Sequence, residues 1–259
     1  MKYSISSLHF CPVKSLSFTD VESCAIKESI GIVNDRIFAL TRNIDLKKAK
    51  LIEKLPKERK LHNFLTLKNS PFLNKYHFKF ENNILTLYKT NTKLVTASIN
   101  DSNELLMISE VLSKQEPTLN LPIFLLKNVN NPFFDTSHSE NYSNTISLIN
   151  LNSIRNFEKK INEKIEFERF RGNIYIEGLE AWKEREWVNK TIKINNIKFK
   201  IKNNIPRCSA TNLQPNTDNV TINLPMTLMK HYNHIDMGIY LIPLSDGKIN
   251  VTDQIKLDE

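Results

Sequence analysis

Short apolar segments separated by turn residues are the feature that most limits how this chain can fold. Between residues 5 and 88 there are six segments of strand length, rich in aromatic, leucine and β-branched residues. They lie at residues 5–10, 21–26, 36–41, 64–67, 76–80 and 84–88. The dipeptide Asn82-Asn83 separates the last two and predicts a hairpin turn. The pattern predicts many short strands in this part of the chain.

Beyond residue 100 the sequence adds a few helical segments. Asp101 to Lys114 begins with a capping residue and has helical apolar spacing, and helices are also predicted over residues 150–162 and 225–231. Further strands are predicted at residues 173–177, 191–194, 198–202, 238–244 and 248–251. The last two are expected to pair as a hairpin around Asp246-Gly247. The chain is therefore predicted to be mainly β, as one barrel or two linked barrels, with a few helices.

The net charge of +8 is compatible with an anionic partner, but it has a simpler explanation. Only eight of the 36 basic residues are arginine, which favours lysine on a solvated surface. The densest basic run, Lys47 to Lys60, also contains glutamates and is predicted to be an exposed loop or helix face. Aromatic residues alternate with apolar ones, which favours the core over a nucleic-acid-binding surface. No nucleic-acid partner is expected.

The sequence shows neither a targeting segment nor a metal-binding motif. The N-terminus lacks the apolar stretch of a signal peptide, and no run approaches the roughly 20 apolar residues that cross a bilayer. The three cysteines form no CxxC pair, and no acidic residue completes a metal site with His231 and His234. These features favour a cytoplasmic protein with no membrane partner, disulfide framework or structural zinc.

Two N-terminal segments carry residues suited to binding an anion. Lys14 and Ser15 follow a proline at the end of the first strand and offer a charge and a hydroxyl to a phosphate. Arg36 follows a glycine turn, and Asp35 beside it could orient its guanidinium toward an anion. The alternatives are a surface lysine in a turn and half of a surface ion pair, and these residues alone leave both open.

Two later segments place arginine beside groups that bind or react. Arg169, Arg171 and Asn173 precede a predicted strand, where an extended backbone would put both arginines on one side. Arg207 adjoins Cys208, and a thiolate beside an arginine is a soft metal ligand or a nucleophile. A chance cluster and a small buried cysteine are the corresponding alternatives.

In this order the segments resemble the MOSC family, especially members with an N-terminal β-barrel extension. That group includes amidoxime-reducing components and bacterial proteins that detoxify N-hydroxylated bases. The matching residues are Pro12-Val13-Lys14-Ser15-Leu16, Asn34-Asp35-Arg36, Ser147, Arg169-Phe170-Arg171-x-Asn173-Ile174, Arg207-Cys208-x-x-Thr211-x-x-x-Pro215-x-Thr217, Gly238-x-Tyr240 and Gly247-Lys248-Ile249-x-Val251-x-Asp253. The resemblance covers nearly the whole chain. It implies an N-terminal MOSC β-barrel domain over residues 1–120 and a MOSC domain over residues 121–259.

The resemblance also implies a molybdenum cofactor, whose pterin dithiolene holds the metal while a protein cysteine adds one sulfur. That cysteine would be Cys208, as metal ligand and catalytic residue, and its burial would shield the sulfur from oxidation. The other implied positions all contact the cofactor or support its site. They are Lys14, Ser15 and Arg36 at the phosphate, Arg171, Asn173 and Arg207 along the cofactor, and Thr211 in the cysteine loop.

Four positions depart from the family pattern. Asn34 and Thr252 stand where the family has glycine, and Gly172 stands where it has proline. Asn150 replaces a serine, which puts one phosphate contact in question. None of these changes removes the implied metal ligand.

The activity implied is reduction of small N-hydroxylated compounds at molybdenum. Because no cysteine-rich ferredoxin extension is present, the two electrons are expected from a separate flavin or iron–sulfur protein. A non-catalytic carrier of cofactor or sulfur would use the same Cys208. The lack of a cysteine-desulfurase domain favours the reductase.

Overall fold

The structure is a computed structural model that describes residues 3–134 and 144–258. Its residues form two compact units. The barrel unit comprises Met1–Phe10, Asp20–Val33 and Asn144–Glu259, and the second unit comprises Cys11–Thr19 and Asn34–Ser143. Each unit draws on separate parts of the chain, and the domain boundary between residues 120 and 121 stays a prediction.

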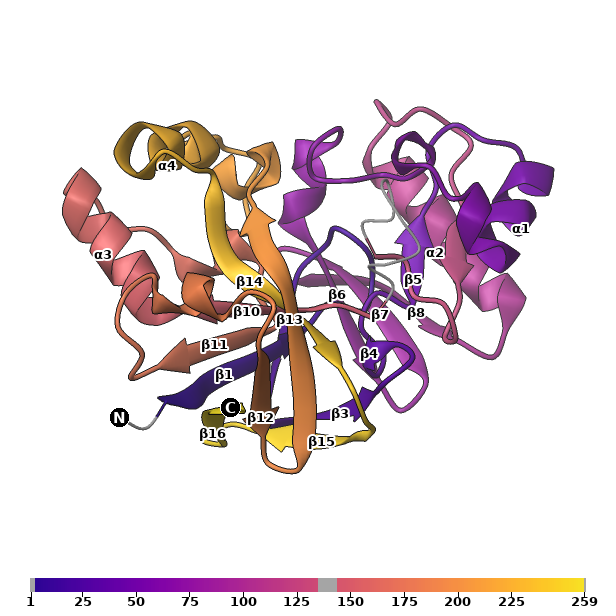
Figure 1. Ribbon diagram of the computed structural model, residues 1–259. Helices are drawn as coiled ribbons and strands as arrows, with labels where there is room; N and C mark the ends of the chain where they lie inside the picture. Colours follow the sequence, from indigo (N-terminus) through magenta and orange to yellow (C-terminus); the bar gives the residue numbers. More distant parts are fainter. Residues whose placement is uncertain (1–2, 135–143, 259) are drawn as a thin grey trace. The chain divides into compact units, whose positions relative to one another are not determined.

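Seven described strands of the barrel unit form a closed barrel, which confirms the predicted mainly β fold (Figure 1). Their order is β11-β10-β14-β13-β12-β16-β1, and the antiparallel pairing of β1 with β11 closes the barrel. Their bounds are β1 (Tyr3–Phe10), β10 (Ile146–Asn150), β11 (Ile174–Glu177), β12 (Thr191–Ile194), β13 (Ile197–Pro206), β14 (Asp236–Pro243) and β16 (Gln254–Asp258).

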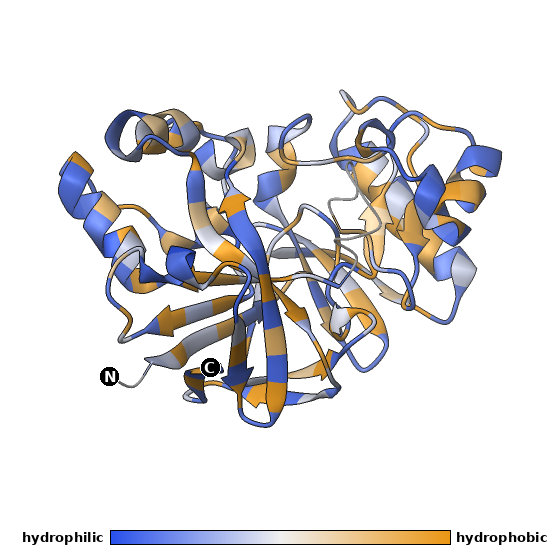
Figure 2. Ribbon diagram, viewed as in Figure 1, coloured by the Kyte–Doolittle hydropathy of each residue, from blue (hydrophilic) through white to orange (hydrophobic). Residues whose placement is uncertain are grey.

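The alternation of apolar and charged residues along the strands explains why this sheet curls around a core. In β13, Ile197, Phe199 and Ile201 are buried, whereas Lys198 and Lys200 are exposed. Figure 2 shows hydrophobic and hydrophilic residues alternating along the strands. The buried side chains join the cluster inside the barrel. Complete burial of one such side chain stabilises the fold by about 2 kcal/mol. Closure lets every strand use its apolar face and leaves few unpaired edges.

β10 and β11 are parallel, so the chain must cross over between them, and helix α3 (Leu151–Ile161) lies in this crossover. Asn150 caps its start by accepting a hydrogen bond from the Asn152 N–H at 3.0 Å, and Asn162 ends it with a φ of 56°. The helix predicted over residues 150–162 is confirmed. With α4 (Leu224–Tyr232), it covers the outside of the barrel (Figure 1).

Two register shifts alter the pairing between the end of β13 and the start of β14. The register shifts between Ile201 and Asn204 and again between Asn204 and Pro206. Gly238 of β14 has a φ of +83°, and a Cβ there would lie 2.4 Å from the Leu148 carbonyl oxygen of β10. Only glycine fits this close crossing of strands. The bulged end of β13 leads directly into the loop that carries Cys208.

A smaller sheet in the barrel unit corrects one prediction. It has the order β15-β3-β4, with β15 (Gly247–Asn250), β3 (Ser23–Lys27) and β4 (Gly31–Ile32). The hairpin expected between β14 and β15 is wrong, because β14 pairs with β10 and β13 whereas β15 pairs with β3. Local turn residues indicated a reversal, but the apolar face of β15 is buried against a distant strand. The short β2 (Thr19–Val21) extends the main sheet beside β1.

The second unit contains two small sheets, β5-β9 and β6-β7-β8. The strands are β5 (Phe38–Leu40), β9 (Leu125–Lys127), β6 (Tyr76–Glu81), β7 (Ile84–Lys89) and β8 (Thr92–Ser98), and the helices are α1 (Leu46–Lys54) and α2 (Ser102–Gln115). The Asn82-Asn83 turn is confirmed, with both φ values positive. The strand predicted at residues 64–67 is wrong, since only Phe64 forms a bridge, with Thr41.

Short 3₁₀ helices connect the larger elements of the described chain. They are η1 (Pro56–Glu58), η2 (Leu61–Asn63), η3 (Pro71–Lys75), η5 (Phe167–Phe170), η6 (Lys183–Trp187) and η7 (Ser209–Asn212). Within residues 3–134 and 144–258, no helix has both the length and the apolar character needed to cross a membrane.

Asn34 and Thr252, which stand where the family pattern has glycine, both have left-handed backbone conformations. The φ of Asn34 is 70° and that of Thr252 is 74°. Asparagine tolerates this region, whereas a β-branched threonine is strained there. The Thr252 side chain is exposed, and the backbone N–H is fixed by donation to the Ile5 carbonyl at 2.9 Å.

Thr252→Gly is expected to raise the free energy of unfolding by about 1 kcal/mol, because it relieves this strain without removing a buried contact. Urea unfolding measures the change. Thr191→Gly in β12 is the matched control and should lower stability, since a glycine weakens a strand interior. A Thr252→Gly variant less stable than the native protein would contradict the assignment of strain.

Candidate functional site

Cys208 lies at the surface of the barrel unit, immediately after β13. Its thiol is free and exposed, so the expectation of a buried sulfur is wrong. The carbonyl oxygen of Cys208 accepts hydrogen bonds from the Thr211 Oγ1 at 2.8 Å and the Thr211 N–H at 3.0 Å. These bonds close the first turn of η7. Thr211 therefore fixes the backbone of the cysteine while the thiol itself stays accessible.

Arg207 holds the same loop from inside. Its guanidinium is buried and donates to the Met237 carbonyl, at 2.9 Å from Nε, and to the Phe170 carbonyl, at 2.7 Å from Nη1. Burial lowers the pKa of Arg207, while the negative forms of neighbouring groups, Cys208 among them, raise it. The side chain thus ties the cysteine loop to β14 and to the end of η5.

The segment before β11 differs from its predicted conformation. The extended backbone expected from residue 169 to residue 173 is wrong, because η5 runs from Phe167 to Phe170 and Arg171 has a φ of 52°. Arg169 is buried and donates to the Asn212 carbonyl at 2.9 Å and to the Thr221 Oγ1 at 2.7 Å. Arg169 therefore holds the loop after the cysteine in place. Arg171, in contrast, is only half-buried.

The backbone of Gly172 is held in place by neighbouring residues. Its N–H donates to the Tyr175 hydroxyl at 2.9 Å, and that hydroxyl donates to the Phe167 carbonyl at 2.9 Å. A Cβ at position 172 would lie 2.7 Å from the Ile149 Cδ1. In this chain Ile149 and Tyr175 fill the space beside position 172, and the Gly172 N–H, which a proline would lack, is hydrogen-bonded.

Asn173 joins three strands through its side chain. Its Oδ1 accepts from the Ser147 Oγ at 2.8 Å and the Ser147 N–H at 3.2 Å, and its Nδ2 donates to the His9 carbonyl at 3.2 Å. Asn173 is buried at the start of β11, so its amide links β10 and β1 to the Arg171 turn. A direct contact with a cofactor stays a prediction.

Asn150, which replaces the family's serine, belongs to a buried network. Its Nδ2 donates to the Glu184 Oε2 and to the Glu180 carbonyl, both at 2.9 Å. The Ser153 Oγ donates to the Glu184 Oε1 at 2.7 Å. The Oδ1 of Asn150 caps α3. Both the oxygen and the nitrogen of this side-chain amide are therefore used in hydrogen bonds within the fold.

The implied phosphate ligands belong to the second unit. Lys14 is buried and its Nζ donates to the Phe134 carbonyl at 2.9 Å. The Arg36 guanidinium pairs with Asp35 and lies 5.1 Å from the centre of the Phe134 ring. Lys14 and Arg36 therefore meet at Phe134, whereas Ser15 lies in the turn after Lys14.

Three of the implied cofactor-binding residues have left-handed backbones. The φ values are 66° at Ser15, 54° at Arg36 and 52° at Arg171. Such residues cost about 1–2 kcal/mol each and persist only where the surroundings fix them. The Arg36 backbone is fixed by donation to the Cys11 carbonyl at 2.6 Å and by acceptance from the Phe133 N–H at 2.7 Å. Strain of this kind often accompanies functional positions.

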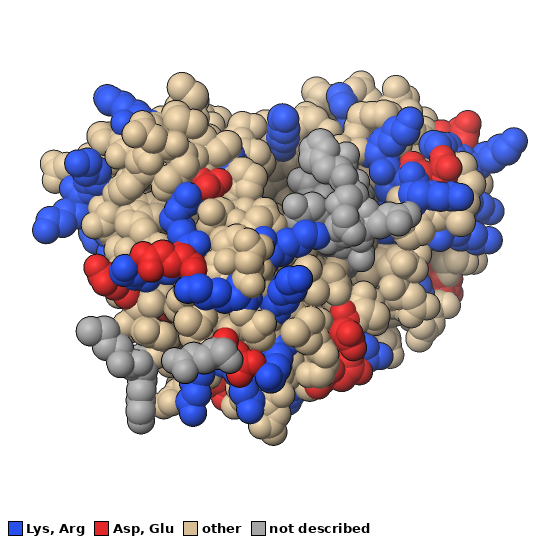
Figure 3. Space-filling model, in the orientation of Figure 1, with Lys and Arg blue, Asp and Glu red and all other residues tan. Residues whose placement is uncertain are grey.

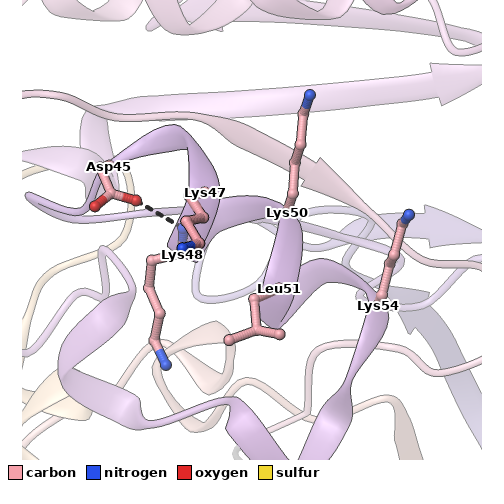
Figure 4. Close-up of a pocket in the computed structure, with 6 residues that line it drawn as sticks. All are labelled: Asp45, Lys47, Lys48, Lys50, Leu51 and Lys54. Carbon is pink, nitrogen blue, oxygen red and sulfur yellow. Dashed lines mark hydrogen bonds between the residues drawn. The ribbon is translucent and has the colours of Figure 1, made fainter.

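A recess along α1 is separate from these residues. It is lined by Asp45, Lys47, Lys48, Lys50, Leu51 and Lys54, and the Lys50 and Lys54 side chains extend to the same side (Figure 4). None of the implied cofactor ligands lines it. Lys and Arg are scattered over the face drawn in Figure 3, with Asp and Glu among them.

A cluster around His9 on the outside of the barrel was not predicted from the sequence. The Nδ1 of His9 is hydrogen-bonded to Asp20 at 2.7 Å and its Nε2 to the Ser7 Oγ at 2.8 Å. Its ring packs edge-on against Tyr175 at 5.2 Å. Burial lowers the pKa of His9, and Asp20 raises it. The i, i+2 spacing of Ser7 and His9 along a strand was the available signal.

Residues 135–256 match the model of the MOSC domain. Mitochondrial amidoxime reducing component 2 of Rattus norvegicus is 29% identical over 94 residues, which cover 36% of this chain and 27% of that protein. The chain thus matches about a quarter of the length of this curated relative.

Two crystal structures are also similar to this chain. The YuaD protein from Bacillus subtilis is 11% identical with a TM-score of 0.46, covering 98% of this chain and 94% of its own. YiiM from Geobacillus stearothermophilus is 15% identical with a TM-score of 0.36, covering 44% of this chain and 54% of its own.

Arg207→Met is expected to lower the free energy of unfolding by about 3 kcal/mol, because the buried carbonyls of Phe170 and Met237 lose their donors. Chemical denaturation measures it. Cys208→Ala is the matched control, since loss of an exposed thiol should change stability by less than about 0.5 kcal/mol. If Arg207→Met were as stable as the native protein, the hydrogen bonds of Arg207 would not be needed for stability.

The buried Glu184 gives a pH-dependent prediction. Burial raises its pKa above the ordinary 4.5, although Ser153 and Asn150 lower it by hydrogen bonding. The stability that a carboxyl of this kind contributes is present below its ordinary pKa and is lost as the pH rises through the folded value. Glu184→Gln should therefore gain stability relative to the native protein as the pH rises above the ordinary pKa of 4.5. A pH-independent difference in urea unfolding would contradict the raised pKa.

Proposed function

The chain is a MOSC domain protein, and on that premise we propose that it binds a molybdenum cofactor and reduces N-hydroxylated compounds. The observation that carries the proposal is the exposed Cys208 thiol on a loop fixed by Thr211 and Arg207. A thiolate is a suitable soft ligand for such a metal, and a fixed backbone holds it in one position. The relative named as an amidoxime reducing component supports the class of substrate.

Taken unit by unit, the described residues are chemically suited to this group. Cys208 would hold the metal, while Arg171, Asn173 and Arg207 would shape the barrel unit's part of the site. In the second unit, Lys14, Ser15 and Arg36 would hold the phosphate, since two cations and a hydroxyl suit that anion. Thr211 keeps the cysteine loop in place. When bound, the cofactor would supply the two-electron redox chemistry.

The residues of the chain have positional and electrostatic roles in this reaction. An N–OH group takes up two electrons and two protons, its N–O bond breaks, and an N–H group and water are formed. A separate flavin or iron–sulfur protein would deliver the electrons. The buried guanidinium of Arg207 holds the cysteine loop in place by donating to the Met237 and Phe170 carbonyls.

Molybdenum and pterin content of protein purified from a cofactor-competent host tests the proposal. Near-equimolar metal and pterin are expected, together with turnover of a hydroxylaminopurine by a reduced dye. Cys208→Ala should lose turnover and lose or alter the metal centre, whereas Ser209→Ala, a change at the next exposed residue, should keep both. Folded native protein without metal and pterin would refute the proposal.

A non-catalytic carrier of cofactor or sulfur is the second candidate, because an exposed thiol is also open to sulfur transfer. It predicts a persulfide on Cys208, detectable by mass spectrometry, and no turnover of N-hydroxylated substrates. Turnover that depends on Cys208 would exclude it.

A further inference from the structure

We propose that Ser7, His9 and Asp20 form a Ser-His-Asp triad in which Ser7 is a nucleophile toward small activated esters. The activity is hydrolysis through an acyl-enzyme, at a site of the barrel unit that uses neither Cys208 nor a cofactor. The inference is therefore independent of the proposed function. None of the three residues belongs to the motifs that carry the family resemblance.

The hydrogen bonds of His9 have the order that a serine nucleophile needs. Its Nδ1 is bonded to the Asp20 Oδ1 at 2.7 Å and its Nε2 to the Ser7 Oγ at 2.8 Å. A carboxylate can only accept, so the ring proton lies on Nδ1, and the neutral ring accepts at Nε2. Ser7 therefore donates its hydroxyl hydrogen to the base. Triads are recognised by this geometry on unrelated folds.

The strands explain how the three side chains meet. Ser7 and His9 are two residues apart in β1, so both point to the face opposite to Leu8, which lies in the barrel core. β2 lies beside β1 in the sheet and brings Asp20 to the same face. Ser7 is half-buried, so its hydroxyl is held by His9 and remains within reach of a small molecule.

The surroundings hold the His9 ring in one orientation and keep it neutral. The ring is buried and packs edge-on against Tyr175 of β11, with 5.2 Å between ring centres, and Phe167 of η5 lies 6.1 Å away. Burial lowers the pKa of His9 below its ordinary 6.5, although the charges of Asp20 on β2 and Glu168 on η5 act against this shift. At neutral pH the ring is therefore free to take up a proton.

The reaction balances with water as the second reactant. The Ser7 Oγ forms a bond to the ester carbonyl carbon while its proton moves to the His9 Nε2. The bond to the leaving oxygen then breaks, and the leaving group takes that proton. A water molecule, deprotonated by the same nitrogen, hydrolyses the acyl-Ser7 bond and releases the acid.

The leaving group sets which substrates can react. The hydrogen bonds of the described residues supply a nucleophile and a base, but they assign no donor to the oxyanion that forms in each step. One such donor contributes roughly 10²–10³-fold to the rate. We therefore expect hydrolysis of activated esters such as p-nitrophenyl acetate, whose leaving group departs easily, and no hydrolysis of amides.

Release of p-nitrophenol from p-nitrophenyl acetate tests the inference. The whole chain carries Cys208→Ala in every sample, because the exposed thiol would compete as a nucleophile. Ser7→Ala should lower the rate about 100-fold, and Asp20→Asn at least about tenfold. The matched controls are Ser6→Ala, at an exposed serine of the same strand, and Glu22→Gln, at an exposed carboxylate beside β2. Both should keep the rate.

A second measurement leaves Ser7 in place and so does not depend on the folding of a variant. A fluorophosphonate should lose fluoride and form an adduct that peptide mass spectrometry locates on Ser7. The esterase rate should rise with pH through the lowered pKa of His9 and become level by about pH 7. By contrast, chance acylation of surface groups keeps rising with pH.

Four results would each overturn the inference. They are an adduct on other residues but not on Ser7, an equal rate with Ser7→Ala, an equal rate with Asp20→Asn, and a rate that keeps rising above pH 7. Because no step uses molybdenum or pterin, each of these results would leave the proposed function standing.

Discussion

The pairing of β1 with β11 is the contact on which the barrel depends. It joins the beginning of the chain to a strand more than 160 residues away, with Ile5 opposite Ile176 and Leu8 opposite Ile174. Without it, the sheet from β11 to β1 would be open and its apolar face would reach solvent. The same closure positions Asn173, whose amide links β1 and β10 at the edge of the candidate site.

The loops above the barrel are held mainly by arginines that donate to backbone carbonyls. Arg207 binds the Met237 and Phe170 carbonyls, and Arg169 binds the Asn212 carbonyl. A guanidinium suits this task because it donates in several directions and stays charged when buried. The result is an exposed cysteine on a rigid support, which is the arrangement that a metal ligand or a reactive thiol needs.

Sequence patterns predicted the elements whose signals are local. The helix over residues 150–162 and the turn at Asn82-Asn83 depend on signals within a few residues, and both were found where expected. Sequence patterns gave wrong predictions where the structure depends on contacts between segments far apart in the chain. The predicted β14–β15 hairpin does not form, because β15 pairs with β3 instead. Arg169 has a structural role, because it donates a hydrogen bond to a carbonyl 43 residues away.

The sequence by itself determined the mainly β character, the turn at Asn82-Asn83 and the resemblance to the MOSC family, because propensity and motif spacing are properties of the chain alone. Only the tertiary structure decided that Cys208 is exposed and that Asn150 and Asn173 are bonded within the fold. Burial and hydrogen-bond partners arise when strands far apart in sequence pack together, and no local pattern records which groups they leave satisfied.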